Sequence, residues 1–241
     1  MAAIDSRRQR AFVSFLGGPG PGSQTAGNGS IGVYDLTTLE EIERVELVPF
    51  VEGLAINDAG TRGAAIGATN GLYLFDPDDL EATLSQTPLR LADDSSGVTF
   101  VAGTDRLVVA NSRNPSNYTV IDASALDTPI ILDEGEPLDA VPFMVAAVPH
   151  REEVVMPLSG TNSLRLLHLD VSRTPARMLH DIEVPDIRTF PQAVTVDPTG
   201  QYVFVGAAAS RELVVFDLAT GHVQRSSWLD RLGPTALVVV P

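Results

Sequence analysis

Four histidines are the side chains of this sequence best suited to acid–base or metal chemistry, and they are far apart along the chain. They fall at a predicted turn, at the end of a predicted strand and on two further strands: His150, His168, His180 and His222. No two of them have the short spacing that is typical of a zinc-binding motif. The sequence therefore predicts hydrogen-bonded or solvent-exposed histidines that do not share a site.

Acidic and glycine-rich segments are the other candidates for chemistry. Three acidic pairs lack the alternating oxygen ligands and the glycine of a calcium-binding loop: Asp78-Asp79, Asp93-Asp94 and Glu152-Glu153. The run from Gly17 to Ser30 is rich in glycine like a phosphate-binding loop, but it has no lysine and no following helix. We expect a flexible loop between two strands there. The sequence therefore predicts no metal ion and no cofactor.

Charge and composition limit the classes of partner. The chain has 241 residues, of which 44% are hydrophobic and 20% are charged, and its formal net charge is -15 at pH 7. This charge repels nucleic-acid phosphates and anionic lipids, so we expect no nucleic acid partner and no membrane insertion. The expected partner is a protein or a small neutral or cationic ligand. Cysteine is absent, which excludes disulfides and thiolate metal sites and leaves the compartment undefined.

Targeting signals are not evident in the sequence as written. The first residues lack the apolar core of a signal peptide, and no apolar run approaches the roughly 20 residues that span a bilayer. The chain is predicted to be soluble. A periplasmic or extracellular location is the alternative if the natural chain begins further upstream.

An internal repeat is the strongest structural signal. The clearest copy runs from Ala193 to Val223 and reads as four short strands joined by turns, AVTVDPTGQYVFVGAAASRELVVFDLATGHV. Similar units begin at Gly53, Gly97 and Met144, so that successive units start 44, 47 and 49 residues apart. Inner strands such as 202–209 are apolar at consecutive positions, as expected of sheets covered on both faces. The sequence predicts an all-β fold, a β-propeller of four-stranded antiparallel blades.

Five blades are expected in a single domain spanning residues 1–241. The predicted blades cover residues 236–241 with 1–50, then 51–92, 95–135, 142–185 and 191–230. Both ends of the chain match the inner strand of the repeat, Ala2 to Asp5 at one end and Ala236 to Val240 at the other. Residues 236–240 are expected to close the ring on the first blade, with Ala2 to Asp5 displaced or beside them. The alternative is a fragment of a longer propeller.

Aspartates recur at the end of the third strand of each unit: Asp35, Asp76, Asp122, Asp170 and Asp217. A catalytic group is needed once, whereas a turn is needed in every blade. We therefore expect these carboxylates to accept hydrogen bonds from backbone N–H groups just downstream and to stabilise the turn. Asp197-Pro198-Thr199-Gly200 and Asn57-Asp58-Ala59-Gly60 are expected to form turns in the same way.

Two segments resemble the YVTN-type β-propeller repeat, whose second strand reads Y-V-x-N and whose third ends V-I-D. Leu107-Val108-Val109-Ala110-Asn111 and Tyr202-Val203-Phe204-Val205 carry the likeness of the second strand, and Val120-Ile121-Asp122 and Val215-Phe216-Asp217 that of the third. The resemblance implies a propeller fold. It implies no single function, because such blades occur in surface-layer proteins, enzyme subunits and lactonases.

A ligand site is expected at the end of the propeller where the inner strands begin, since the varied polar residues gather there. The predicted ligand-binding residues are Glu52, Asn111, Arg113, Asn114, Arg188 and Gln192. No catalytic residue is predicted. Lactonase-like propellers often carry a histidine at these entries, which here read Gly233-Pro234-Thr235, Phe190-Pro191-Gln192 and Val141-Pro142-Phe143. We expect a non-catalytic propeller that binds a ligand or protein; the alternative is a lactonase-like hydrolase or an enzyme subunit.

Overall fold

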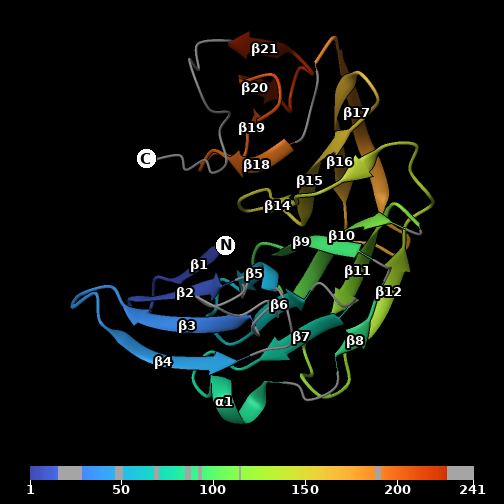
Figure 1. The fold of residues 1–241 in the computed structure, drawn as a ribbon. Helices are drawn as coiled ribbons and strands as arrows, with labels where there is room; N and C mark the ends of the chain where they lie inside the picture. Colours follow the sequence, from blue (N-terminus) through green and yellow to red (C-terminus); the bar gives the residue numbers. More distant parts are fainter. Residues whose placement is uncertain are drawn as a thin grey trace, which may run out of the picture.

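Five antiparallel sheets, numbered here as blades 1 to 5 in chain order, make up the computed structural model of the chain. The structure describes residues 1–15, 29–46, 51–67, 71–84, 88–91, 94–113, 115–187 and 191–226. Figure 1 shows the blades arranged around a centre, with β1, β5, β9, β14 and β18 innermost. The prediction of an all-β propeller with four-stranded antiparallel blades is confirmed.

The strands of blades 1, 2 and 3 follow one another from the inside outwards. Blade 1 contains β1 (Ala2–Asp5), β2 (Arg10–Phe15), β3 (Ser30–Asp35) and β4 (Glu41–Glu46). Blade 2 contains β5 (Val51–Ile56), β6 (Gly63–Gly67), β7 (Gly71–Phe75) and β8 (Leu89–Arg90). Blade 3 contains β9 (Asp94–Phe100), β10 (Arg106–Arg113), β11 (Asn117–Asp122) and β12 (Ile130–Glu134).

Blade 4 differs from the others in its inner strand, which is divided into two short pieces that both pair with β15. It contains β13 (Val141–Pro142), β14 (Ala146–Ala147), β15 (Glu153–Ser159), β16 (Ser163–Asp170) and β17 (Arg177–Pro185). Blade 5 contains β18 (Pro191–Val196), β19 (Tyr202–Ala207), β20 (Glu212–Asp217) and β21 (Val223–Ser226). The described residues include one short helix, α1 (Leu80–Thr83), and no helix among them is long and apolar enough to cross a bilayer.

Apolar side chains packed between neighbouring blades form the core. Four buried clusters each join one consecutive pair of blades, from blades 1 and 2 to blades 4 and 5. Their fully buried members include Phe12, Phe75, Ile121, Met156 and Phe216. The middle strands β6 and β7 are buried at every position, which agrees with the apolar runs of the sequence. Each blade is therefore held by the blade beside it.

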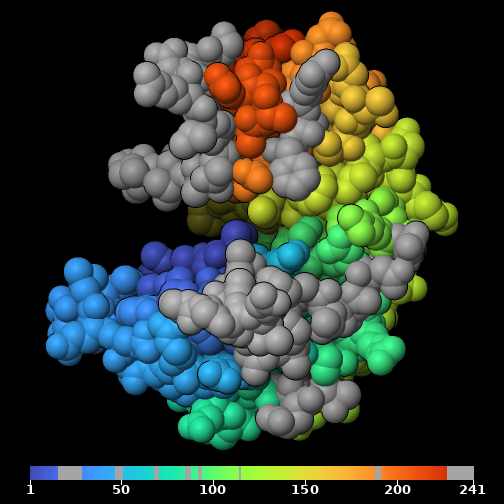
Figure 2. All heavy atoms as spheres, viewed as in Figure 1, coloured from blue at the N-terminus to red at the C-terminus, as the bar shows by residue number. Residues whose placement is uncertain are grey.

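Blades 1 and 5 are the two ends of this series. No apolar cluster of the described residues joins them, and their atoms, blue for blade 1 and orange to red for blade 5, stand apart in the view of Figure 2. β1 pairs with β2 from Ala2 opposite Val13 to Asp5 opposite Arg10, so Ala2–Asp5 is not displaced from blade 1. The expected closing strand, residues 236–240, lies outside the described residues.

The five recurring aspartates form the turns that were predicted. In each blade one carboxylate oxygen accepts a hydrogen bond from the backbone N–H two residues downstream. The acceptors and donors are Asp35 and Thr37 (2.6 Å), Asp76 and Asp78 (2.9 Å), Asp122 and Ser124 (2.9 Å), Asp170 and Ser172 (3.1 Å), and Asp217 and Ala219 (2.9 Å). These carboxylates stabilise the turn into the outer strand, and their repetition has a structural cause.

The first turns of the blades follow the same principle. Asp197 Oδ1 accepts from the backbone N–H groups of Gln201 at 2.8 Å and Tyr202 at 2.7 Å, and Asn57 Oδ1 accepts from Thr61 at 2.8 Å. Gly60 and Gly200 close these turns with φ of 67° and 73°, a left-handed conformation that glycine adopts without steric cost. Both turns predicted from the sequence are confirmed.

We predict that Asp122→Ala lowers the free energy of unfolding by about 0.5–1.5 kcal/mol at pH 7, because it removes the acceptor of the hydrogen bond from the backbone N–H of Ser124. Asp122→Asn, which keeps an acceptor oxygen, should lose about half as much. The hydrogen bond from Ser124 holds the pKa of Asp122 below its ordinary value. The stabilisation is therefore present above the ordinary aspartate pKa and is lost as pH falls through the lowered one.

Urea unfolding of the two variants at pH 7 and pH 3 measures this effect. Asp127→Ala is the matched control, because Asp127 is exposed and lies outside the turn hydrogen bond. An Asp122→Ala chain as stable as the Asp127→Ala chain at pH 7 would show that the recurring aspartates do not stabilise the turns.

Candidate functional site

A cavity of about 650 Å³ lies where the inner strands of the blades begin. Its wall combines apolar and polar side chains: Met1, Glu52, Asp94, Ser96, Ser112, Arg113, Phe143, Met144, Pro191 and Gln192. All five blades contribute, since Met1 precedes β1, and the others belong to β5, β9, β10, the segment between β13 and β14, and β18. We call it the mouth cavity. Concave sites of this size and mixed character are typical of ligand-binding pockets.

Close approach of neighbouring inner strands shapes the mouth cavity. A Cβ on Gly53 would lie 2.9 Å from the carbonyl oxygen of Ser96, and one on Gly97 would lie 2.8 Å from the carbonyl oxygen of Phe143. Only glycine lets the backbones of blades 2, 3 and 4 come this near to one another. Ser96 Oγ also donates a hydrogen bond to the carbonyl oxygen of Phe143 at 2.9 Å, which ties blade 3 to blade 4 at the cavity wall.

Three of the six predicted ligand-binding residues meet on this cavity. Glu52, Arg113 and Gln192 line it from blades 2, 3 and 5. Asn111 does not, because it is 1% exposed and lines a smaller cavity of about 270 Å³ beside Asn117 and Glu134. Asn114 and Arg188 lie outside the described residues.

Asn111 belongs to a buried hydrogen-bond network inside blade 3. Its Nδ2 donates to Asn117 Oδ1 at 2.7 Å and to Thr119 Oγ1 at 2.8 Å, and its Oδ1 accepts from Ser95 Oγ at 2.7 Å. Asn117 Nδ2 donates in turn to the carbonyl oxygen of Gly135 at 2.9 Å. The amide is fully satisfied within the protein, so its role in this structure is to join the strands of the blade.

Electrostatics distinguish two carboxylates of the mouth cavity. Arg113 Nε lies 3.4 Å from Asp94 Oδ2, although the Arg113 side chain is 74% exposed, so this pair is weakly held. Burial, with a smaller contribution from the charge of Asp94, raises the pKa of Glu52. No cation among the described residues forms an ion pair with Glu52. Glu52 is therefore a carboxylate without an ion-pair partner among the described residues, next to apolar walls, and Met1 also lines the cavity, where burial lowers the pKa of its α-amino group.

Several residues of the cavity could not be chosen from sequence. In the sequence, Asp94 stands out only as the partner of Asp93 in an acidic pair, and Phe143 and Met144 only as part of a blade entry without histidine. Their common signal is position, since each stands at or near the start of an inner strand.

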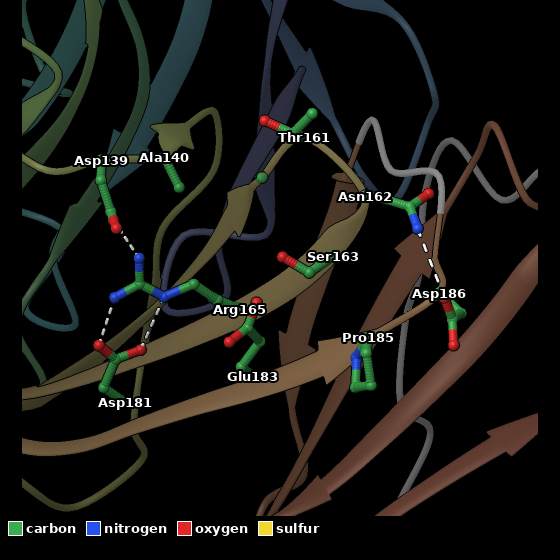
Figure 3. A pocket seen from close by; sticks show the side chains of 11 residues that line it. Asp139, Ala140, Thr161, Asn162, Ser163, Arg165, Asp181, Glu183, Pro185 and Asp186 are labelled. Carbon is green, nitrogen blue, oxygen red and sulfur yellow. Dashed lines mark hydrogen bonds and ion pairs between the residues drawn. The ribbon is translucent and has the colours of Figure 1, made fainter.

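A second cavity, of about 580 Å³, lies on blade 4 between the residues that precede β13 and the strands β16 and β17 (Figure 3). Arg165 stands between Asp139 and Asp181 and bonds to both, with its Nε 3.0 Å from Asp181 Oδ1. Glu183 and Asp186 add further negative charge, and Asn162 Nδ2 is 3.4 Å from Asp186 Oδ1. The only cation that lines this cavity is already engaged, and four of its five charged groups are acidic.

His168 and His180 lie close together, so the expectation that all four histidines are scattered over the fold is wrong. His168 on β16 and His180 on β17 are directly opposite each other across the two strands, and their Nδ1 atoms are 3.5 Å apart. His150 lines a separate cavity of about 390 Å³ near the ends of the inner strands, and His222 is exposed. None of the four lines the mouth cavity.

Similar solved structures are β-propellers, and the likeness concerns the fold. Hydrazine synthase of Kuenenia stuttgartiensis matches with a TM-score of 0.72 at 16% identity over 93% of this chain and 64% of that chain. The WD40 repeats of RRP9 match with a TM-score of 0.69 at 12% identity, over 93% and 62%. The β-propeller domain of Cps50 (Swd1) from Myceliophteria thermophila matches with a TM-score of 0.57 at 10% identity, over 94% and 86%.

The chain spans less than two thirds of the length of hydrazine synthase and RRP9 chains that it matches. No protein-family model matches the sequence, and no curated protein is significantly similar to it. The comparisons thus agree with the five blades and show the chain to have the β-propeller fold.

We predict that Glu52→Gln raises the melting temperature by about 1–2 °C at pH 7. Burial of the charged form destabilises the folded chain above the raised pKa of Glu52, and this cost disappears as the carboxyl is protonated at lower pH. The gain should therefore vanish by pH 4. Calorimetry of this variant beside Glu46→Gln, an exposed glutamate on β4, tests it. An equal effect of the two substitutions would contradict the buried charge.

Proposed function

We propose that the chain is a non-catalytic propeller scaffold that binds part of another protein at the mouth cavity. The single observation that supports this most is the convergence of all five blades on one cavity whose residues differ from blade to blade. Repeated structural residues, such as the turn aspartates, need no such variation. A binding site for one ligand on a pseudo-symmetric scaffold does need it.

The chemistry of the cavity favours a cationic group attached to an apolar one. Glu52 offers a carboxylate that no cation of the described residues pairs with, and Phe143, Met144 and Pro191 offer apolar surface in the same cavity. A lysine or arginine side chain flanked by apolar residues combines both features in a peptide. The net charge of -15 would also attract a basic segment over longer distances.

An enzymatic function is the second candidate, and Glu52 is the observation in its favour. A carboxyl whose pKa is raised in a cavity is suited to act as a general acid. No histidine lines the mouth cavity, and within the described residues no group of three or more acidic or histidine side chains is arranged to hold a metal ion. Lactonase-like or other hydrolysis therefore has less support than binding.

We predict that peptides with one basic residue between apolar residues bind the chain, and that Glu52→Gln weakens them about tenfold, because one charge-assisted contact is lost. Phe143→Ala should weaken both basic and neutral peptides, since it removes apolar contact area. A peptide array followed by fluorescence anisotropy measures these affinities. Peptides in which glutamate replaces the basic residue are the ligand control.

Glu183→Gln is the matched control variant, because Glu183 lines the blade 4 cavity and not the mouth. Binding that is lost with Glu183→Gln and retained with Glu52→Gln and Phe143→Ala would place the site on blade 4 and contradict the proposal. Turnover on a panel of lactones that Glu52→Gln abolishes would favour the enzyme instead.

A further inference from the structure

His168 and His180 form a close pair at the outer side of blade 4. The two residues are register partners on neighbouring strands, their ring centroids are 5.5 Å apart, and the rings are inclined by 50°. His168 is buried at 3% exposure, whereas His180 is half-buried on the outer strand β17. The space between the rings is therefore held by two rigid strands and can be reached from the side of His180.

Glu153 determines which nitrogen of His168 carries a proton. Glu153 Oε2 lies 2.8 Å from His168 Nε2, and an ionised carboxylate can only accept a hydrogen bond. Nε2 therefore carries the proton, and in the neutral ring Nδ1 presents its lone pair toward His180 Nδ1. A carboxylate behind one imidazole nitrogen and a free lone pair on the other is the arrangement that orients histidine ligands of metal ions.

The separation of the two nitrogens fits a shared metal ion better than a hydrogen bond. At 3.5 Å the Nδ1 atoms are farther apart than in an ordinary hydrogen bond. Tetrahedral zinc with Zn–N distances of about 2.0–2.1 Å holds two nitrogens about 3.3 Å apart. A shift of a few tenths of an ångström would therefore complete the geometry.

We propose that His168 Nδ1 and His180 Nδ1 bind one transition-metal ion of the zinc class, with Glu153 as the carboxylate that orients His168. The described residues contain no third acidic or histidine ligand at this point, so water completes the coordination. The ion would join the third and outer strands of blade 4. Hard cations such as Mg²⁺, which prefer oxygen ligands, are excluded by the two imidazoles.

Calorimetric titration of the full chain with ZnCl₂ tests the site, with MgCl₂ as the control ion. The expected result is one zinc ion per chain and no magnesium binding, together with a melting temperature that rises with zinc concentration. His180→Ala should weaken zinc binding at least tenfold and remove the rise. Glu153→Gln should weaken it about tenfold. His222→Ala, which removes an exposed histidine of blade 5, should change nothing.

Zinc binding by His180→Ala that equals the wild type, or no zinc-specific binding by the wild-type chain, would overturn the proposal. If His180→Ala does not fold, His180→Gln is used in its place, because glutamine is close to histidine in size. Imidazole ¹⁵N spectra give a readout without any variant. Zinc should shift the Nδ1 resonances of His168 and His180 and leave the proton on His168 Nε2, and shifts confined to His150 or His222 would contradict the site.

Discussion

Packing between neighbouring blades is the interaction on which the rest of the structure depends. The middle strands of blade 2 are buried at every position and those of blades 3 and 4 at most positions, so these sheets need a neighbour on either side. Four buried clusters meet this need in chain order from blade 1 to blade 5. The same packing draws the inner strands toward one centre, where Gly53 and Gly97 permit contacts that any side chain would prevent.

The mouth cavity follows from this convergence. Inner strands that begin at the same end of five adjacent sheets must bring their first residues together, whatever those residues are. The scaffold is therefore responsible for the shape of the cavity, and the particular side chains at these positions are responsible for its chemistry. Here they place one half-buried carboxylate, Glu52, beside apolar groups, and this combination is the basis of the proposed binding of a cationic group with apolar neighbours.

The repeat made the fold predictable, together with three of the ten residues listed above for the wall of the mouth cavity, Glu52, Arg113 and Gln192. The turn aspartates and the positions of Glu52 and Gln192 follow from alignment of the blades. The burial of Asn111 does not follow from that alignment. The pairing of β10 with β9 is irregular on both sides of Asn111, and the amide of this residue lies inside the blade. His168 and His180 are 12 residues apart, and only the length of the intervening turn and a shift in register after His168 make them partners. Such register details are not visible in a sequence of alternating short strands.

The most direct test of the central claim is to locate where a minimal cation with an apolar tail binds. Amide chemical-shift mapping with n-butylammonium, compared with neutral butanol at the same concentration, reports this at each residue. We expect cation-specific shifts to gather on Glu52, Asp94, Phe143 and Gln192, which belong to four different blades. Shifts that gather instead on Asp139, Asp181 and Glu183 of the blade 4 cavity, or that are equal for the two probes, would contradict it.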